Sequence, residues 1–222
     1  MDDLTLVVPA KNEAETLPTV LKDLEKYKLN TIVVLEKEDI NTIDAIKNLN
    51  CKILYQEGLG YGDALIQGIN NVNTKYFCIF NADGSFLSRE LKEMYKYLKE
   101  YNFDFVFGSR YMKNGYSEDD TIITLIGNRI FSFLGKIFFS LEISDILYTY
   151  VMGDTEKAKG LEMKEKKFAF CVELPIKAKK RGYKLISIPS YEKPRIAGRK
   201  KVNAFKDGFI ILFSMIKFFI FK

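Results

Sequence analysis

Short apolar runs alternate with amphipathic segments along the first hundred residues of the chain. The runs are rich in β-branched or aromatic residues and lie at 4–8, 31–35, 52–55, 76–80 and 104–107. Runs of this length and composition predict strands. Apolar residues recur at helical spacing over 14–26, 64–71 and 89–101, and Ser88 is the expected N-cap of the last of these helices. Strands separated by helices predict an α/β fold, doubly wound around a mostly parallel sheet with helices on both faces.

The pattern changes after residue 108, where apolar positions dominate. Residues 121–141 have a mostly helical period, 168–181 predict a helix and 185–189 predict a late strand. Residues 208–221 are almost wholly apolar but shorter than the ~20 residues that span a bilayer. They predict either an interfacial helix or a terminal helix docked on the protein's own core. We therefore expect a main domain over 1–202 and a C-terminal apolar and basic helix over 203–222.

The composition excludes several kinds of catalytic and metal-binding site. The 222 residues are 47% hydrophobic and include no histidine, which excludes His-based triads, His general bases and His metal ligands. Cys51, Cys78 and Cys171 lack the spacing of a metal site, so we expect buried free thiols in a reducing compartment. The acidic N-terminus leads straight into a strand, so no secretory signal is expected.

Charge is unevenly distributed along the chain. From Lys177 to the end there are 13 basic residues against two acidic ones, a net charge of +11, whereas the first 176 residues carry 21 basic and 27 acidic groups. A basic tail of this kind is expected to bind phosphates, either on a substrate or on an anionic membrane surface. No nucleic-acid partner is expected, and self-association is left open.

Polar clusters follow two of the predicted strands. Asn12 and Glu13 come after Pro9 and Ala10 at the end of the first strand, where side chains and backbone amides can bind a nucleotide. The alternative is ordinary capping of the next helix. The glycines of 57–65, including Gly62, either let the backbone approach a phosphate or sugar or simply make a turn. A dinucleotide fingerprint is a poor match, because these glycines follow the third strand.

The fourth strand ends in Asn81-Ala-Asp-Gly-Ser85. Asp83 offers a carboxylate oxygen to Mg²⁺ or Mn²⁺, with diphosphate oxygens and water completing the coordination. The alternative is a turn aspartate that caps the next helix. Arg110, at the end of the fifth strand, is a candidate anion clamp. A basic set at Arg195, Arg199, Lys200 and Lys201 is either a loop over the site or a solvated run of charge.

These motifs together resemble family 2 glycosyltransferases of the GT-A fold, and specifically the dolichol-phosphate mannosyltransferase and polyprenyl-phosphate glycosyltransferase branch. The resemblance covers nearly the whole chain. It is carried in order by Val8-Pro-Ala-Lys-Asn-Glu13, Gly60-Tyr-Gly-Asp-Ala-Leu65, Asn81-Ala-Asp-Gly-Ser85, Gly108-Ser-Arg-Tyr111, Arg129, Asp145, Glu173 and Arg195-x-x-Gly198-x-x-Lys201. The chain departs from the family at Asn81, which stands where an aspartate is expected, and at Glu36, where the family has two aspartates.

The resemblance implies an inverting, metal-dependent transfer of a hexose from a nucleoside-diphosphate sugar, GDP-mannose or a UDP-sugar, to a polyprenyl phosphate. The implied donor site consists of Pro9, Ala10, Asn12, Glu13, Glu36, Gly62, Asn81, Ala82 and Asp83. The implied metal ligands are Asp83 and Ser85. The implied catalytic residues are Asp83, Arg110, Arg129, Arg195 and Lys201. The enzyme is then expected to be cytoplasmic and peripherally bound to the inner face of the membrane.

Two other functions stay open at this point. One is the same fold acting on a soluble saccharide or protein, which would need a carboxylate base, with Asp145 or Glu173 as candidates. The other is a non-catalytic nucleotide-sugar binder, suggested by Asn81. A phosphate acceptor is already anionic and needs no strong base, which suits a chain without histidine.

Overall fold

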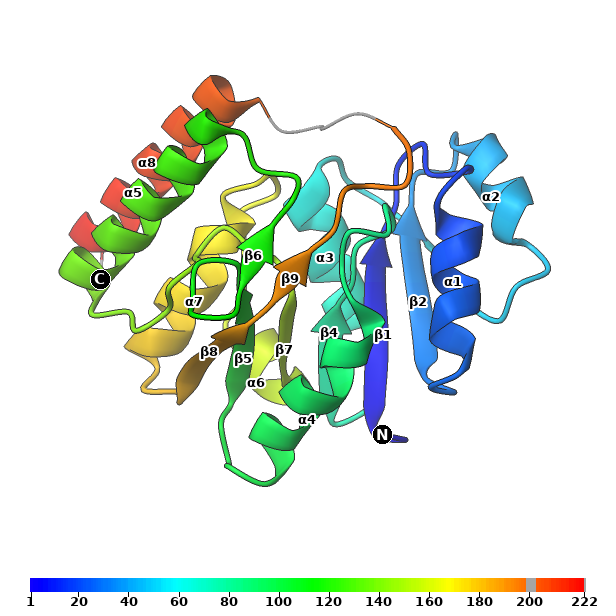
Figure 1. Cartoon of the computed structure of the whole chain (residues 1–222), viewed down its shortest axis with the longest axis horizontal. Coiled ribbons are helices and arrows are strands. Elements are labelled where there is room, and N and C mark those ends of the chain that lie inside the picture. The colour runs from blue at the N-terminus through cyan, green and yellow to red at the C-terminus, as the bar shows by residue number, and fades with distance from the viewer. Residues whose placement is uncertain (199–202, 222) are drawn as a thin grey trace.

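The computed structural model of the protein describes residues 1–198 and 203–221. A seven-stranded sheet lies at its centre, in the order β3-β2-β1-β4-β7-β5-β8, and β6 pairs with β9 beside it (Figure 1). The strands are β1 (Leu4–Pro9), β2 (Asn30–Leu35), β3 (Lys52–Tyr55), β4 (Tyr76–Ile79), β5 (Phe105–Ser109), β6 (Tyr116–Ser117), β7 (Val151–Asp154), β8 (Leu185–Pro189) and β9 (Tyr191–Glu192). Six of these strands were predicted to within about two residues at each end, whereas β6, β7 and β9 were not.

The seven-stranded sheet is parallel except at β7, which pairs antiparallel with both β4 and β5. This arrangement confirms the predicted doubly wound α/β fold of the GT-A type. β7 escaped prediction because its four residues, Val-Met-Gly-Asp, continue an apolar stretch that contains no turn signal. The strand nevertheless decides the topology, since it fills the gap between the two halves of the sheet.

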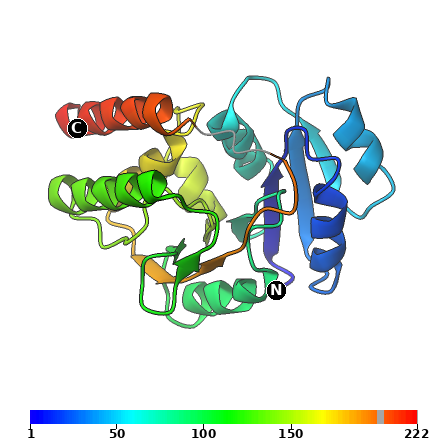
Figure 2. The same ribbon diagram turned by 45° about the horizontal axis from the view of Figure 1, so that its top comes forward.

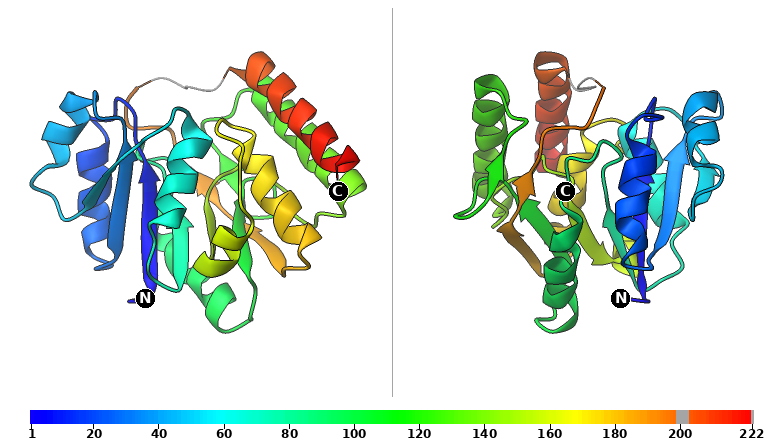
Figure 3. Two further views of the ribbon diagram at one scale, coloured as in Figure 1. Left: turned by 180° about the vertical axis from the view of Figure 1, so that it is seen from behind. Right: turned by 45° about the vertical axis from the view of Figure 1, so that its right-hand side comes forward.

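Helices cover both faces of the sheet, as Figures 2 and 3 show from other directions. They are α1 (Leu17–Glu25), α2 (Ile40–Ile46), α3 (Tyr61–Asn70), α4 (Leu91–Lys99), α5 (Ile122–Phe139), α6 (Thr155–Gly160), α7 (Phe170–Lys180) and α8 (Ala204–Ile220). One core joins α1, α2 and α4 to one face of the sheet, and a second core joins α3, α6, α7 and the inner edge of α8 to the other face. All three cysteines are free thiols, as expected.

Several helix starts differ from the predictions, by up to four residues, and two of them are explained by specific contacts. α1 begins at Leu17 rather than at 14, because residues 13–16 form a turn in which Leu17 N donates to Glu13 O. Ser88 does not cap α4; it opens a 3₁₀ turn over 88–90, and its hydroxyl donates to Asp23 Oδ2 at 2.5 Å. The capping prediction was wrong because the serine hydroxyl donates to a carboxylate from a distant part of the chain, that of Asp23.

α5 and α8 lie side by side on the flank of the molecule formed by α7 (Figures 1 and 3). Phe219 of α8 contacts Phe138 and Phe139 of α5 edge to ring. Only Ile211, Ser214 and Met215 of α8 are buried. The exposed apolar faces of the two helices are here called the apolar slab; it comprises Ile122, Ile123, Ile126, Ile130, Phe133, Ile137 and Phe138 of α5 and Phe205, Phe209, Leu212, Phe213, Ile216, Phe219 and Ile220 of α8.

Among the helices of the described residues, α5 alone is long and apolar enough to cross a membrane by length and composition. Only 11% of that window is buried inside the protein. A helix in the core of a globular protein would be mostly buried, whereas α5 packs on the second core along one edge only, through Phe131, Leu134 and Phe139.

Candidate active site

The ends of β1, β2, β4 and β5 meet at one edge of the sheet and line a single cavity of about 570 Å³. Ten of the predicted site residues lie on its wall: Pro9, Ala10, Asn12, Glu13, Glu36, Asn81, Ala82, Asp83, Arg110 and Arg195. Parallel strands bring their carboxyl ends to the same edge, which is why polar clusters far apart in the sequence converge here. The predicted convergence of Asn12, Asp83 and Arg110 is therefore present.

The loop after β1 is fixed by α2. Asn12 has a left-handed backbone with φ of 53°, and its N–H donates to the Asp39 carboxylate at 2.6 Å. The next N–H, that of Glu13, donates to Thr42 Oγ1 at 2.9 Å. Asp39 is also the N-cap of α2, since its other oxygen accepts from the backbone of Thr42. The loop therefore presents its outer surface to the cavity in one defined conformation.

The Asp83 carboxylate is oriented by the turn that follows β4. Its Oδ1 accepts from Ser85 N at 3.0 Å and from Ser85 Oγ at 2.7 Å. Ser85 is 1% exposed and does not line the cavity. Its hydroxyl is thus committed to Asp83, which suits an orienting residue better than the metal ligand that the sequence predicted.

A single carboxylate at this turn is compatible with a divalent cation. Within residues 1–198 and 203–221 no group of three or more His, Cys, Asp or Glu side chains is arranged to hold a metal. Mg²⁺ at nucleotide sites is commonly held by one or two carboxylates together with substrate phosphates. Asp83, on the cavity wall with one oxygen fixed by Ser85, fits that pattern.

Arg110 is tied down by carboxylates. Its Nε and Nη2 donate to the two oxygens of Asp145 at 2.7 and 3.0 Å, and Nη1 donates to Glu192 at 3.1 Å. Burial alone would lower the pKa of Arg110, but the charge of Asp145, the hydrogen bonds to it and the charge of Glu192 together outweigh burial and raise that pKa well above the usual value. The guanidinium also lies 4.6 Å from the Tyr148 ring. Arg110 reaches the cavity wall as a fixed element rather than as a freely moving clamp.

The pKa of Glu192 is raised because burial outweighs the opposing effect of Arg110. Its Oε2 also accepts from Ser117 Oγ at 2.5 Å. The pair β6 and β9 is thereby joined to the end of β5 through Arg110, so the cavity wall on this side is one connected polar network.

Arg195 links two sides of the cavity. Its Nη2 donates to Asp119 Oδ2 at 3.0 Å, and its Nη1 lies 3.8 Å from Asp83 Oδ2. The backbone after Arg195 is also bonded to the turn that holds Asp83, since Ile196 N donates to Asp83 O at 2.9 Å. Arg195 thus lies beside the carboxylate predicted to bind the metal. The other basic residues predicted for this loop, Arg199, Lys200 and Lys201, are outside the described residues.

Besides Ser85, two predicted residues lie away from the cavity wall. Arg129 is exposed on α5, with its guanidinium 5.7 Å from the Tyr111 ring. Gly62 is buried in α3, where an added Cβ would lie 2.2 Å from Glu165 O and 2.6 Å from Lys167 O. Close packing of α3 on the 165–170 segment explains this glycine, and direct contact with a nucleotide is not needed to explain it.

Several cavity residues escaped the sequence analysis. Asp120 accepts from Tyr111 Oη at 2.6 Å and from Thr124 Oγ1 at 3.0 Å, and Asn128 Nδ2 donates to Tyr111 Oη at 2.7 Å. This network joins the start of α5 to the cavity. The available signal was Asp119-Asp120 directly before Thr121, which forms a capping box with Thr124.

The cavity becomes apolar toward α7 and α8. Leu147, Phe168, Cys171 and Ile211 line this end. Tyr61 stacks on Phe168 with ring centroids 5.2 Å apart, and its hydroxyl pairs with Thr149 at 2.7 Å. Burial raises the pKa of the Cys171 thiol to about 12, so it is an unreactive apolar wall group. The cavity thus runs from a polar end at β1 and β2 to an apolar end beside α8.

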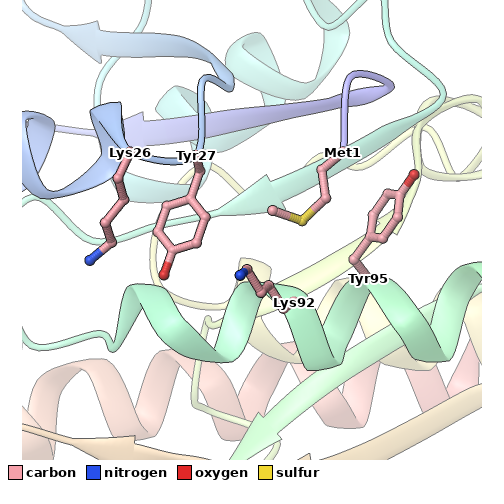
Figure 4. Close-up of a pocket in the computed structure, with 5 residues that line it drawn as sticks. All are labelled: Met1, Lys26, Tyr27, Lys92 and Tyr95. Carbon is pink, nitrogen blue, oxygen red and sulfur yellow. The ribbon is translucent and has the colours of Figure 1, made fainter.

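A second hollow, of about 650 Å³, lies at the other end of β1 (Figure 4). It is lined by Met1, Lys26, Tyr27, Lys92 and Tyr95. None of the predicted site residues that the structure describes lines it. The cavity at the carboxyl edge of the sheet is therefore the candidate active site.

Comparison with known proteins agrees with this geometry. The profile of glycosyl transferase family 2 matches residues 5–161, so the chain belongs to that family and is a glycosyltransferase. Glycosyltransferase AglJ of Haloferax volcanii is 24% identical over 97% of this chain and 72% of its own length. Uncharacterized protein MJ1222 of Methanocaldococcus jannaschii is 26% identical over 97% and 91%.

Solved structures share the fold at low identity. Glucosyl-3-phosphoglycerate synthase of Mycobacterium tuberculosis, crystallised with Mn²⁺, uridine diphosphate and glucosyl-3-phosphoglycerate, superposes with a TM-score of 0.75 at 11% identity, covering 97% of this chain and 79% of that one. Mannosyl-3-phosphoglycerate synthase of Rubrobacter xylanophilus gives 0.71 at 14% identity, covering 97% and 72%.

Proposed function

We propose that this glycosyltransferase moves a hexose, with inversion, from a nucleoside-diphosphate sugar to a polyprenyl phosphate at an anionic membrane surface. The observation that carries the proposal is the course of the cavity. It starts among the polar residues of β1, β2 and β4 and ends at Leu147, Phe168 and Ile211, and Ile211 belongs to one of the two helices of the apolar slab. The polar end fits a nucleoside-diphosphate sugar, and the apolar end fits the hydrocarbon chain of a polyprenyl phosphate.

The donor end supports a diphosphate bound with Mg²⁺ or Mn²⁺. Asp83 would hold the cation, with Ser85 keeping the carboxylate in position and Asn81 beside it. When bound, the metal ion neutralises negative charge on the departing nucleoside diphosphate. Arg195 would add positive charge there. The neighbouring structures with Mn²⁺ or Mg²⁺ and uridine diphosphate support this assignment.

The acceptor end supports a nucleophile that is already charged. Asp145 is completely buried against Arg110, and the Glu173 carboxylate accepts from the backbone N–H groups of 164 and 165. Neither of these candidate bases lines the cavity. A phosphate monoester attacks without deprotonation, so positioning supplies the rate. Arg129, which is exposed on α5 beside the Tyr111 ring, would receive the acceptor phosphate, and Arg110 would hold the surrounding carboxylates in place.

The apolar slab supports docking on a bilayer. Fourteen large apolar side chains on two adjacent helices form an exposed patch far beyond what isolated surface hydrophobes explain. Arg129, Lys136, Lys206 and Lys217 lie on the same helices, against the single acid Asp207. Apolar side chains with interspersed cations are typical of helices that lie in the interface of anionic membranes. We therefore assign 203–222 to an anchor and 1–202 to the catalytic domain.

A soluble phosphorylated acceptor is the second candidate. The structural neighbours were crystallised with phosphoglyceric acid or glucosyl-3-phosphoglycerate, which are small and water-soluble. The same cavity would admit such a molecule without using its apolar end. This alternative predicts activity in the absence of lipid and no role for the slab.

The test is a transfer assay with radiolabelled GDP- and UDP-hexoses and Mn²⁺. Polyprenyl phosphate in anionic vesicles is compared with 3-phosphoglycerate as acceptor. We expect product only with the lipid, and we expect Arg129→Ala to lose transfer while keeping donor affinity. The matched control is Arg181→Ala, an exposed arginine after α7 and away from the cavity. Full transfer by Arg129→Ala would remove that residue from the mechanism, and transfer to 3-phosphoglycerate alone would refute the lipid acceptor.

A further inference from the structure

Three polar side chains from neighbouring elements gather at the β1–β2 end of the cavity. Lys11 lies in the loop after β1, Glu36 follows β2 and Gln56 follows β3, and all three line the cavity. β2 and β3 are parallel partners with Leu35 opposite Tyr55, so Glu36 and Gln56 leave the sheet side by side. Gln56 N also donates to Leu35 O at 2.9 Å, which fixes this register.

Lys11 and Glu36 form a pair in which each offers a different kind of group. Lys11 Nζ donates to Glu36 Oε1 at 2.7 Å. An ammonium group is a donor with three N–H bonds and a carboxylate is an acceptor with two oxygens, so the pair presents both kinds of group to a ligand. A ligand edge with an acceptor next to a donor is complementary to it.

Gln56 adds an acceptor whose direction is fixed. Its Nε2 donates to Gly60 O at 2.9 Å and to Asp63 Oδ2 at 3.0 Å. Both partners only accept hydrogen bonds, so the amide cannot be flipped without losing both bonds. Asp63 is buried and is itself held by Gln67 Nε2 at 2.5 Å. The atom that Gln56 keeps for a ligand is therefore its carbonyl oxygen.

We propose that Lys11, Glu36 and Gln56 select guanine as the base of the donor. Taken in the order β1, β2, β3, the three residues offer one hydrogen-bond donor, Lys11, and two acceptors, Glu36 and Gln56. The Watson–Crick edge of guanine presents the complementary set, the O6 acceptor followed by the N1–H and N2–H donors, whereas uracil presents acceptor, donor, acceptor. The second uracil oxygen would face an acceptor, and an unpaired polar group is costly. The inference rests on the proposed function, in that the donor is a nucleoside-diphosphate sugar.

The experiment measures nucleotide affinity on the full chain by calorimetry in Mn²⁺, with GDP, IDP and UDP as probes. IDP lacks only the 2-amino group of GDP. One hydrogen bond corresponds to a factor of about 2–10 in affinity, so GDP is expected to bind that much tighter than IDP. UDP is expected to bind at least about 10-fold more weakly than GDP, because it also meets a mismatched acceptor.

Two variants locate the effect. Gln56→Leu is expected to bring GDP down to the IDP level and to leave IDP unchanged. Glu36→Gln is expected to weaken GDP about 10- to 100-fold, since it removes a charge-assisted acceptor. Glu38→Gln, an exposed carboxylate two residues further on and off the cavity wall, is the matched control.

The outcomes separate this inference from the proposed function. UDP binding as tightly as GDP, or IDP as tightly as GDP, would overturn guanine selection and leave the donor site intact. Failure of all three nucleotides to bind would overturn both. The IDP comparison uses the unmodified protein, so it decides the matter even if a variant does not fold.

Discussion

Membrane docking by the apolar slab yields a prediction that can be worked out from one side chain. Phe213 exposes 70% of its surface on the outer face of α8. A phenylalanine can bury about 150–250 Å², so roughly 100–175 Å² is available to the bilayer. At about 25 cal/mol per Å², full insertion would contribute roughly 3–4 kcal/mol. Phe213→Gln keeps a good helix former and removes most of this area. Since insertion into the interface is partial, vesicle affinity is expected to fall about 10- to 100-fold.

The assay is co-sedimentation with vesicles containing anionic phospholipid, over a range of lipid concentrations. The matched control is Ile40→Gln, which changes an apolar side chain 57% exposed on α2, at the other end of the molecule (Figure 1). Both variants should keep the melting temperature, because neither side chain is packed in a core. Unchanged vesicle binding by Phe213→Gln, or equal loss by the control, would refute docking through the slab.

Three further results are expected. Asp83→Asn should abolish the Mn²⁺-dependent rise in melting temperature with a nucleoside diphosphate, and an unchanged rise would exclude this carboxylate as the metal ligand. Arg110→Met leaves Asp145 buried and unpaired, so urea unfolding should show a loss of about 3–5 kcal/mol, and a loss under about 1 kcal/mol would contradict the network. Burial raises the pKa of Glu90 to about 7 from an ordinary 4.5, against the opposing hydrogen bond from Ser190. Because the native state holds this proton more tightly than the unfolded chain, stability should fall as pH rises from about 4.5 to 7. Urea unfolding at several pH values should show a smaller fall in Glu90→Gln, and an equal slope in both proteins would disprove the assignment.

The sequence predicted the parallel sheet and the gathering of polar residues in one cavity, because both follow from local patterns. Strand runs ending in Pro9 or before Asp83 place their polar residues at the carboxyl edge whenever the strands are parallel. The positions of the polar residues directly after each strand are enough for that conclusion. Ten of the predicted residues line the cavity.

Partners that come from distant segments could not be predicted. Arg110 was expected to be available for an anion, yet Asp145 and Glu192, 35 and 82 residues away along the chain, hold its guanidinium. Ser88 had the position of a helix cap, but Asp23 accepts its hydroxyl. Local propensity cannot show which tertiary carboxylate competes for a donor. Gly62 belonged to a glycine-rich stretch, and only the coordinates reveal the carbonyls packed against it.

β7 has a consequence for how the protein is made. Among the described residues, the β3-β2-β1-β4 half of the sheet pairs with the β5-β8 half only through β7. β4 ends at Ile79 and β7 ends at Asp154. At ordinary rates of translation, the edge of β4 therefore lacks its partner strand β7 for roughly 4–15 seconds. The residues at that edge, Tyr-Phe-Cys-Ile, are all apolar, and their outer backbone groups are unpaired during this time. The nascent chain is therefore expected to be prone to aggregation in this interval, and chaperone dependence should be governed by β7 more than by any strand of the β3-β2-β1-β4 half.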